Sequence, residues 1–134
     1  MFEDDQDISA IREAIKSLCE KFPEKYWRQT DRSRSYPKEF VKALSDHGYL
    51  GCLIPEKYGG SGQKLRAATV ILEEIHRSGG NGAACHAQMY IMGTLLRHGS
   101  EDRNKNIFQE LLKAVCGFRL LELLSLKVEP IRFL

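Results

Sequence analysis

The sequence predicts an all-α fold, an up-and-down helical bundle with short connections. Apolar residues recur three and four positions apart in successive segments, which is the spacing of one helix face. Glycine and proline punctuate the breaks between these segments, and no segment shows the strict alternation of a strand. A chain of 134 residues is long enough for one domain with a single core.

The first helix is predicted from a cap at Asp5 or Asp7 to its end just before Pro23. Its apolar stripe consists of Ile8, Ile11, Ile15, Leu18 and Phe22. Residues 24–35 are polar and are assigned to no helix. Within them, Tyr26 and Trp27 are expected to anchor the segment to the core.

The second helix is predicted from Pro37 to His47, because proline suits a first turn, where its missing N–H costs nothing. Its inward face carries Phe40 and Leu44, with His47 on the same side. Gly48 follows as a left-handed cap. After an apolar bend, the glycines of GGSG at positions 59–62 permit a sharp turn.

The third helix is predicted from Lys64 to Arg77 and the fourth from Ala83 to His98, with Asn81 as the cap of the fourth. In the third helix the inward residues are Leu65, Ala68, Leu72 and Ile75, and Glu73 and Glu74 are expected to point outward. The fourth helix carries small residues that allow close approach of a neighbouring helix or a ligand. A further helix begins at Ser100.

Composition excludes several classes of function. The net charge of +2, from 20 basic and 18 acidic residues, does not favour nucleic-acid binding. No stretch reaches the ~20 apolar residues of a membrane span, and the acidic N-terminus is no signal peptide. The four scattered cysteines are expected to be reduced, buried thiols. A cytoplasmic protein is therefore expected.

No catalytic, metal-binding or cofactor-binding residues are predicted. The histidines at 76, 86 and 98 lack matching carboxylates or thiols for a metal site. Cys85 and His86 are adjacent, so on a helix they point about 100° apart and form no nucleophile–base pair. The GGSG segment is neither a nucleophile elbow nor a P-loop.

Three segments carry a resemblance to a known family: YPKEFVKALSDHGYLGCLIPEKYGGSG from Tyr36, then ATVILEEIHRSGG, then MGTLLRHGSEDRNK. In this order they resemble the N-terminal helical domain of acyl-CoA dehydrogenases, over about residues 8–105. The resemblance implies a protein that uses FAD to oxidise an acyl-CoA thioester, and a homo-oligomer when full length. In that family a β-domain and a C-terminal helical domain follow, and a catalytic glutamate lies after the β-domain.

The N-terminal domain of the family mainly supplies a wall of the acyl pocket. By this resemblance the helix from Ala83 to Met92 faces the acyl chain, with His86, Met89 and Tyr90 as its candidate residues. None of the three can perform the chemistry. The chain is therefore expected to bind FAD weakly and to be inactive alone.

The sequence of residues 106–134 differs from the continuation that is typical of the family. We therefore divide the chain into a helical domain at residues 1–105 and a tail at residues 106–134. Synonymous codons can be chosen for Glu122–Leu134 so that the same DNA, read one base out of frame, encodes GITEPKGGTDTIL. This hidden sequence resembles the family's flavin-contacting motif. The same frame permits KYFPGIAKGSLRFQAF before it. We therefore expect the tail to be a frameshift product, so that the β-domain and the C-terminal helical domain are absent from this chain.

A second interpretation makes the tail a real helix. Ile107, Leu111, Val115 and Phe118 are roughly helically spaced. The chain would then be a stand-alone helical protein-interaction module that docks through the leucines at 120, 121, 123 and 124.

Overall fold

The structure is a computed structural model that describes residues 2–113. Within this range the chain is helical and contains no strand, which confirms the all-α prediction. The α-helices are α1 (Phe2–Glu20), α2 (Glu24–Arg32), α3 (Lys38–Asp46), α4 (Leu65–Arg77), α5 (Ala83–His98) and α6 (Glu101–Lys113). Two short 3₁₀ turns, η1 (Tyr49–Gly51) and η2 (Glu56–Tyr58), lie between α3 and α4.

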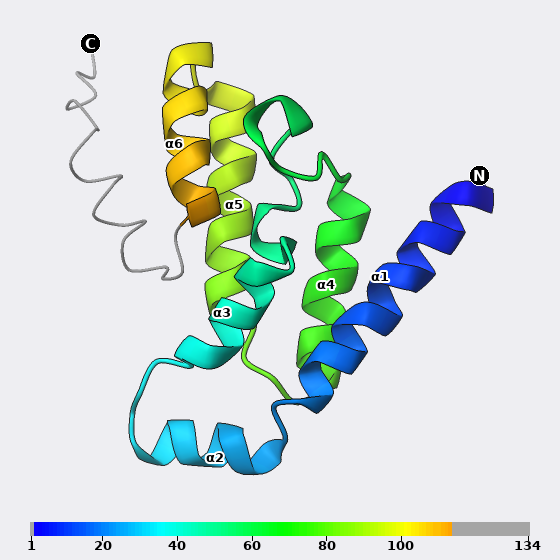
Figure 1. Cartoon of the computed structure of the whole chain (residues 1–134), viewed down its shortest axis with the longest axis vertical. Coiled ribbons are helices and arrows are strands. Elements are labelled where there is room, and N and C mark those ends of the chain that lie inside the picture. Colours follow the sequence, from blue (N-terminus) through cyan, green and yellow to red (C-terminus); the bar gives the residue numbers. More distant parts are fainter. Residues whose placement is uncertain (1, 114–134) are drawn as a thin grey trace.

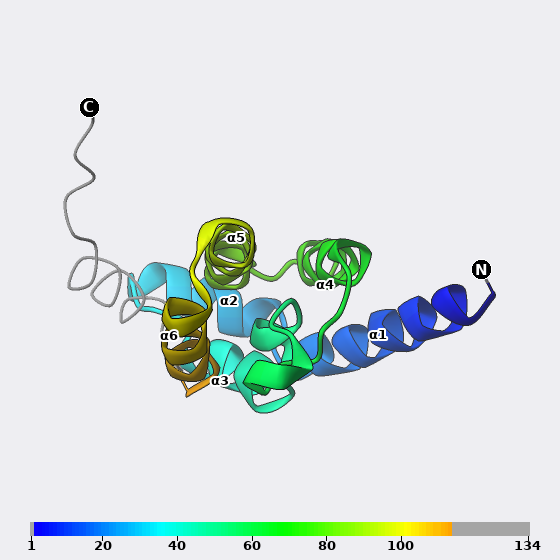
Figure 2. The same ribbon diagram turned by 90° about the horizontal axis from the view of Figure 1, so that it is seen from above.

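The helices form two layers. Figure 2 shows α4 and α5 side by side in one row, and α1, α3 and α6 in the other. The short helix α2 crosses one end of the bundle (Figure 1). The core lies between the layers and draws on every long helix, with Ile15, Phe40, Leu44, Ile71, Ile75, Met92 and Phe108 fully buried.

Helix α2 contradicts the prediction that residues 24–35 hold no helix. None of its residues is buried, so it lacks the apolar stripe by which the other helices are recognised. Tyr26 and Trp27 do anchor it as predicted, because both pack against the core. The Trp27 ring meets the Phe40 ring edge-to-face, with the ring centres 4.8 Å apart.

Most predicted helix ends lie within one or two residues of the observed ends. Gly48 has the predicted left-handed backbone, with φ of 76°. The N-cap of α5 is Gly82 rather than the predicted Asn81, which lies one residue earlier and accepts a hydrogen bond from the backbone N–H of Ala83 at 2.9 Å. The prediction of a cap at Asp5 or Asp7 is wrong, because α1 already begins at Phe2.

The predicted orientations of two side chains on α4 are also wrong. Leu65 is 73% exposed, because it occupies the first position of the helix, beyond the edge of the core. Glu74 is only 3% exposed, because it pairs with Arg12 of α1 across the bundle.

Helix α6 crosses Lys105 without interruption. Ile107, Phe108 and Leu111 are buried in the core, and Leu112 packs against it. Val115, Phe118 and the four leucines of the interaction-module interpretation lie outside the described residues. Among the described helices, none combines the length and apolar character that a bilayer crossing demands.

Candidate functional site

The outer face of α5 is the side that points away from the other layer. We define it by the exposed residues Ala83, His86, Tyr90, Thr94 and Arg97, which recur three and four positions apart. The whole helix contains no aspartate or glutamate, and the basic residues of its last turn are Arg97 and His98. A solvent-facing helix side without carboxylates is unusual, because exposed faces are normally rich in charges of both signs.

The inner face of α5 is fixed by burial and by one side-chain amide. Cys85, Met89 and Met92 are buried in the core. The Gln88 amide nitrogen donates to the carbonyl oxygens of Leu50, at 3.0 Å, and Leu111, at 3.3 Å. These two hydrogen bonds tie α5 to η1 and α6, so the rotation of the helix about its own axis is set.

The predicted wall residues divide between the two faces. His86 and Tyr90 lie together on the outer face, where their rings meet edge-to-face with centres 5.6 Å apart. Met89 points the other way and is 5% exposed, so it contributes to the core. The i, i+4 spacing of His86 and Tyr90 places them on one side of a helix, whereas Met89 sits about 100° round from Tyr90.

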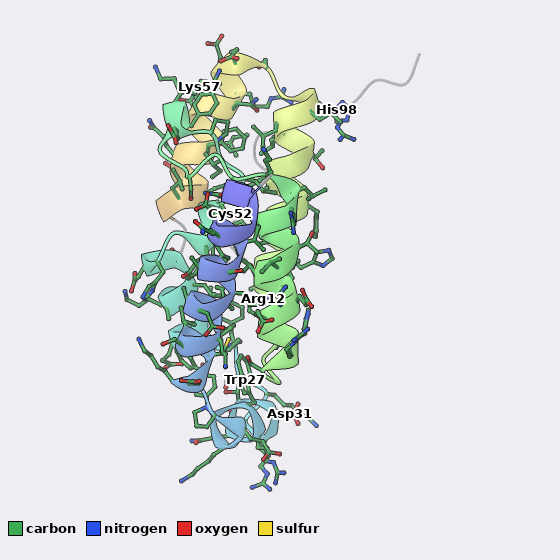
Figure 3. The ribbon with its side chains drawn as sticks, turned by 90° about the vertical axis from the view of Figure 1, so that its right-hand side faces the viewer. Arg12, Trp27, Asp31, Cys52, Lys57 and His98 are labelled. Atoms are coloured by element: carbon green, nitrogen blue, oxygen red, sulfur yellow. The ribbon has the colours of Figure 1, made fainter. Side chains whose placement is uncertain are left out.

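A shallow depression of about 270 Å³ opens on the outer face beside Tyr90. It is lined by Tyr90, Gly93, Thr94, Arg97 and His98, and His98 is labelled at that end of the molecule in Figure 3. A Cβ atom at Gly93 would meet nothing within 4 Å, so this glycine leaves open space rather than permitting a close contact. Gly93 is one of the small residues of this helix that were expected to allow close approach of a helix or a ligand. Thr94 and Arg97 were not predicted, although their spacing from Tyr90 is the signal that would have found them.

The carboxylates of Glu73 and Glu74 are not available for acid–base chemistry. Arg12 bonds to both, at 3.0 Å to Glu73 and through a second, closer contact to Glu74. Arg77 also contacts Glu73, at 2.8 Å. Figure 3 places Arg12 between α1 and α4, so this cluster is the seam that joins the two helices. The hydrogen bond from Arg12 lowers the pKa of Glu73, which keeps the group charged near neutrality.

The described cysteines cannot act as nucleophiles either. Cys19, Cys52 and Cys85 are free and buried, as predicted for reduced core thiols. Burial raises the pKa of Cys52 to about 11 and that of Cys85 to about 12, so both stay protonated at neutral pH. Cys116 lies outside the described residues. Among residues 2–113, no cluster of His, Cys, Asp and Glu could hold a metal ion.

Residues 5–114 match the family model for the N-terminal domain of acyl-CoA dehydrogenase. This chain belongs to the acyl-CoA dehydrogenase family. It is 30% identical over 113 residues to the probable acyl-CoA dehydrogenase FadE25 of Mycobacterium tuberculosis, an alignment covering 83% of this chain and 29% of that protein. No solved structure shows a significant match to the chain.

Two further relatives show the same partial coverage. The 3-(aryl)acrylate reductase of Clostridium sporogenes is 29% identical over 105 residues, which are 77% of this chain and 28% of that protein. The probable acyl-CoA dehydrogenase YdiO of Escherichia coli K12 is 33% identical over 86 residues, which are 60% of this chain and 22% of that protein. The chain thus spans less than a third of the length of these relatives.

Membership of the acyl-CoA dehydrogenase family implies FAD in the full-length proteins. A glycine loop such as the one at positions 59–62 could bind the pyrophosphate of FAD only through free backbone N–H groups. In this loop the backbone N–H groups of the three glycines are already used: Gly59 donates to Glu56, Gly60 to Pro55 and Gly62 to Ile54. A Cβ at Gly60 would lie 2.0 Å from the Ile54 carbonyl oxygen, so the glycine is needed for the loop to close on itself. A phosphate cradle needs amides that point outward, so this loop does not fit the pyrophosphate of FAD.

Proposed function

We propose that this chain is the N-terminal helical domain of a FAD-dependent acyl-CoA dehydrogenase and that the outer face of α5 forms one wall of its acyl pocket. The observation that carries the proposal is the solvent-facing side of α5, which lacks carboxylates, inside a domain that matches this family. An apolar acyl chain requires such a wall, because a carboxylate placed against it would lose its water without gaining a partner.

Within this function the chain contributes binding and no chemistry. Its paired carboxylates are engaged by Arg12, its described thiols stay protonated, and its glycine loop does not fit FAD. The α,β-dehydrogenation of an acyl-CoA thioester would depend on a catalytic glutamate and a flavin site outside residues 2–113. The chain alone is therefore expected to turn over no substrate and to purify without a yellow flavin band.

The proposed wall is tested by titrating the isotope-labelled 134-residue chain with the octanoyl thioester of N-acetylcysteamine, a soluble stand-in for acyl-CoA. We expect the NMR amide signals of α5 around His86 and Tyr90 to shift, and Tyr90→Glu to abolish the shifts. Tyr90 is 55% exposed, so the added charge leaves the core intact. The matched control is Thr69→Glu, at an exposed position of α4. Shifts confined to other helices, or unchanged in Tyr90→Glu, would contradict the proposal.

We also propose that the residues from about Asn106 onward arise from a one-base frameshift. The support is a hidden reading frame that one permitted set of synonymous codons gives, which continues the family pattern for about 30 positions; the visible frame matches the family model as far as residue 114. The helical domain and the tail would then meet near Lys105, inside α6. Resequencing the coding DNA across codons 103–108 tests this proposal. The frameshift is refuted if the DNA encodes the visible residues but its shifted frame does not encode the family pattern.

A cytoplasmic location and a homo-oligomeric assembly of the full-length protein belong to the same proposal. The location is inferred from the composition of the sequence, and the assembly from the family resemblance. Size-exclusion chromatography of a product read through in the shifted frame tests the assembly.

A further inference from the structure

The outer face of α5 is aromatic rather than aliphatic. Its largest exposed side chain is Tyr90, and the neighbouring large side chain on this face is His86. The His86 ring meets Tyr90 edge-on, with an angle of 77° between the ring planes. Tyr90 remains more than half exposed, and its side chain forms one side of the depression.

The floor of the depression is flat at Gly93. The next residue, Thr94, directs its hydroxyl to the Tyr90 carbonyl oxygen at 2.8 Å, so this hydroxyl is not available as a donor to a ligand. The remaining lining residues, Arg97 and His98, stand at one edge. The depression therefore combines an aromatic wall, a floor without a side chain and a basic edge.

This combination suits a planar ring better than a straight alkyl chain. The depression of about 270 Å³ is open to solvent and is lined by residues of α5 alone, so a ring would lie against Tyr90 over Gly93 rather than enter a closed cavity. A ring against Tyr90 gains an aromatic contact beyond the area it buries, and the Arg97 guanidinium can face its π-surface. An alkyl chain gains only the buried area.

We propose that the depression beside Tyr90 and Gly93 accepts an aromatic ring in the acyl group, so that the substrate is an aryl-substituted acyl thioester. This inference rests on the function proposed above. It assigns Tyr90 as the residue that contacts the ring and Gly93 as the residue that leaves space for it.

The test uses three N-acetylcysteamine thioesters with nine acyl carbons each: 3-phenylpropanoyl, 3-cyclohexylpropanoyl and nonanoyl. The saturated probes are the more hydrophobic, so a site that responds to apolar area alone binds them more tightly. We expect the phenyl probe to bind the 134-residue chain about three- to tenfold more tightly than the cyclohexyl probe. The amide shifts should centre on Tyr90, Gly93 and Thr94.

Two variants separate binding from folding. Gly93→Leu fills the depression but replaces glycine by a good helix former at a position with free space, so it should stabilise the fold while weakening the phenyl probe about tenfold. Tyr90→Leu should remove the preference between phenyl and cyclohexyl, and Tyr90→Phe should keep it. The matched control is Leu96→Ala, which is exposed on α5 but does not line the depression.

The outcomes distinguish this inference from the proposed function. If the saturated probes shift the outer face of α5 as strongly as the phenyl probe, the aryl preference is refuted and the acyl-wall function stands. If no probe shifts that face, both proposals fail. If Gly93→Leu leaves the affinity of the phenyl probe unchanged, the depression is not the site of the ring.

Discussion

Helices α4 and α5 lie next to each other in the same layer, but their solvent-facing sides differ in chemistry (Figure 2). The exposed edge of α4 carries charged groups that find partners within the domain, since Glu73 bonds to both Arg12 and Arg77. The outer face of α5 carries no carboxylate and presents Tyr90 to solvent, since no element within residues 2–113 covers it. Helix α4 is thus completed by this domain, whereas α5 has one face that is suited to a ligand.

The difference concerns the outer faces only, because both helices contribute equally to the core. Ile71 and Ile75 of α4 and Met92 of α5 are each at most 1% exposed. Stability should therefore respond to changes on the inner faces, and ligand binding to changes on the outer face of α5.

The largest effect is expected from Met92→Ala. Met92 is fully buried between the layers, so its truncation removes apolar contacts and leaves a cavity that costs about 2–5 kcal/mol of unfolding free energy. Urea denaturation followed by circular dichroism measures the loss. Tyr90→Ala, two positions earlier on the outer face, should change the free energy of unfolding by less than about 0.5 kcal/mol. Equal losses at the two positions would mean that the outer face is covered within the domain.

The next effect concerns the seam between α1 and α4. Glu74→Ala deletes a side chain that is 3% exposed and removes the charged hydrogen bond from Arg12, at a cost of about 1–3 kcal/mol. The matched control is Glu73→Ala, which removes the exposed neighbour on the same arginine and should cost much less. If Glu73→Ala is as damaging as Glu74→Ala, the seam depends on net charge rather than on the buried contact.

The sequence predicted much of this fold because most helices are amphipathic and end at glycine or proline. The bounds of α5 were found from the pattern around Asn81 and Gly99. Helix α2 was missed because its aromatic residues Tyr26 and Trp27 are adjacent and form no periodic stripe. Local patterns cannot show such a helix, because its contacts with Phe40 and the core are made in three dimensions.

The candidate site was predicted less completely. His86 and Tyr90 share a face by spacing alone, and the structure places them in contact. Glu74 was placed outward because its partner, Arg12, lies 62 residues away and the periodicity of α4 carries no information about it. Gly93 was predicted only as one of several small residues that allow close approach of a helix or a ligand. The sequence could not show that it opens a depression on the solvent-facing side of α5, because the packing of α5 against the other layer decides which side that is.

A smaller effect, with the opposite sign, is expected from Gly93→Ala. Glycine within a helix lowers stability by about 0.5–1 kcal/mol relative to alanine, and a Cβ at this position meets nothing within 4 Å. The variant should therefore unfold at a higher urea concentration than the natural chain. The same change at Gly60 should destabilise the protein, because a Cβ there would collide with the Ile54 carbonyl. A destabilising Gly93→Ala would show that the outer face is more tightly packed than the structure indicates.

The smallest effect is the dependence of stability on pH through Glu73. Arg12 lowers the pKa of this carboxylate below its ordinary value of 4.5, so folding is favoured by the ionised form. The contribution is fully present above the unfolded pKa and disappears as the pH falls through the lower, folded value. Unfolding midpoints of the natural chain should thus decline between about pH 5 and 3, and the decline should be weaker in Glu73→Gln. The outer face of α5 contains no carboxylate that could produce such a dependence, so Tyr90→Phe should keep the pH profile of the natural chain. A flat profile in the natural chain would mean that the bond between Arg12 and Glu73 adds nothing to the seam, and the buried contact with Glu74 would then hold α1 to α4 alone.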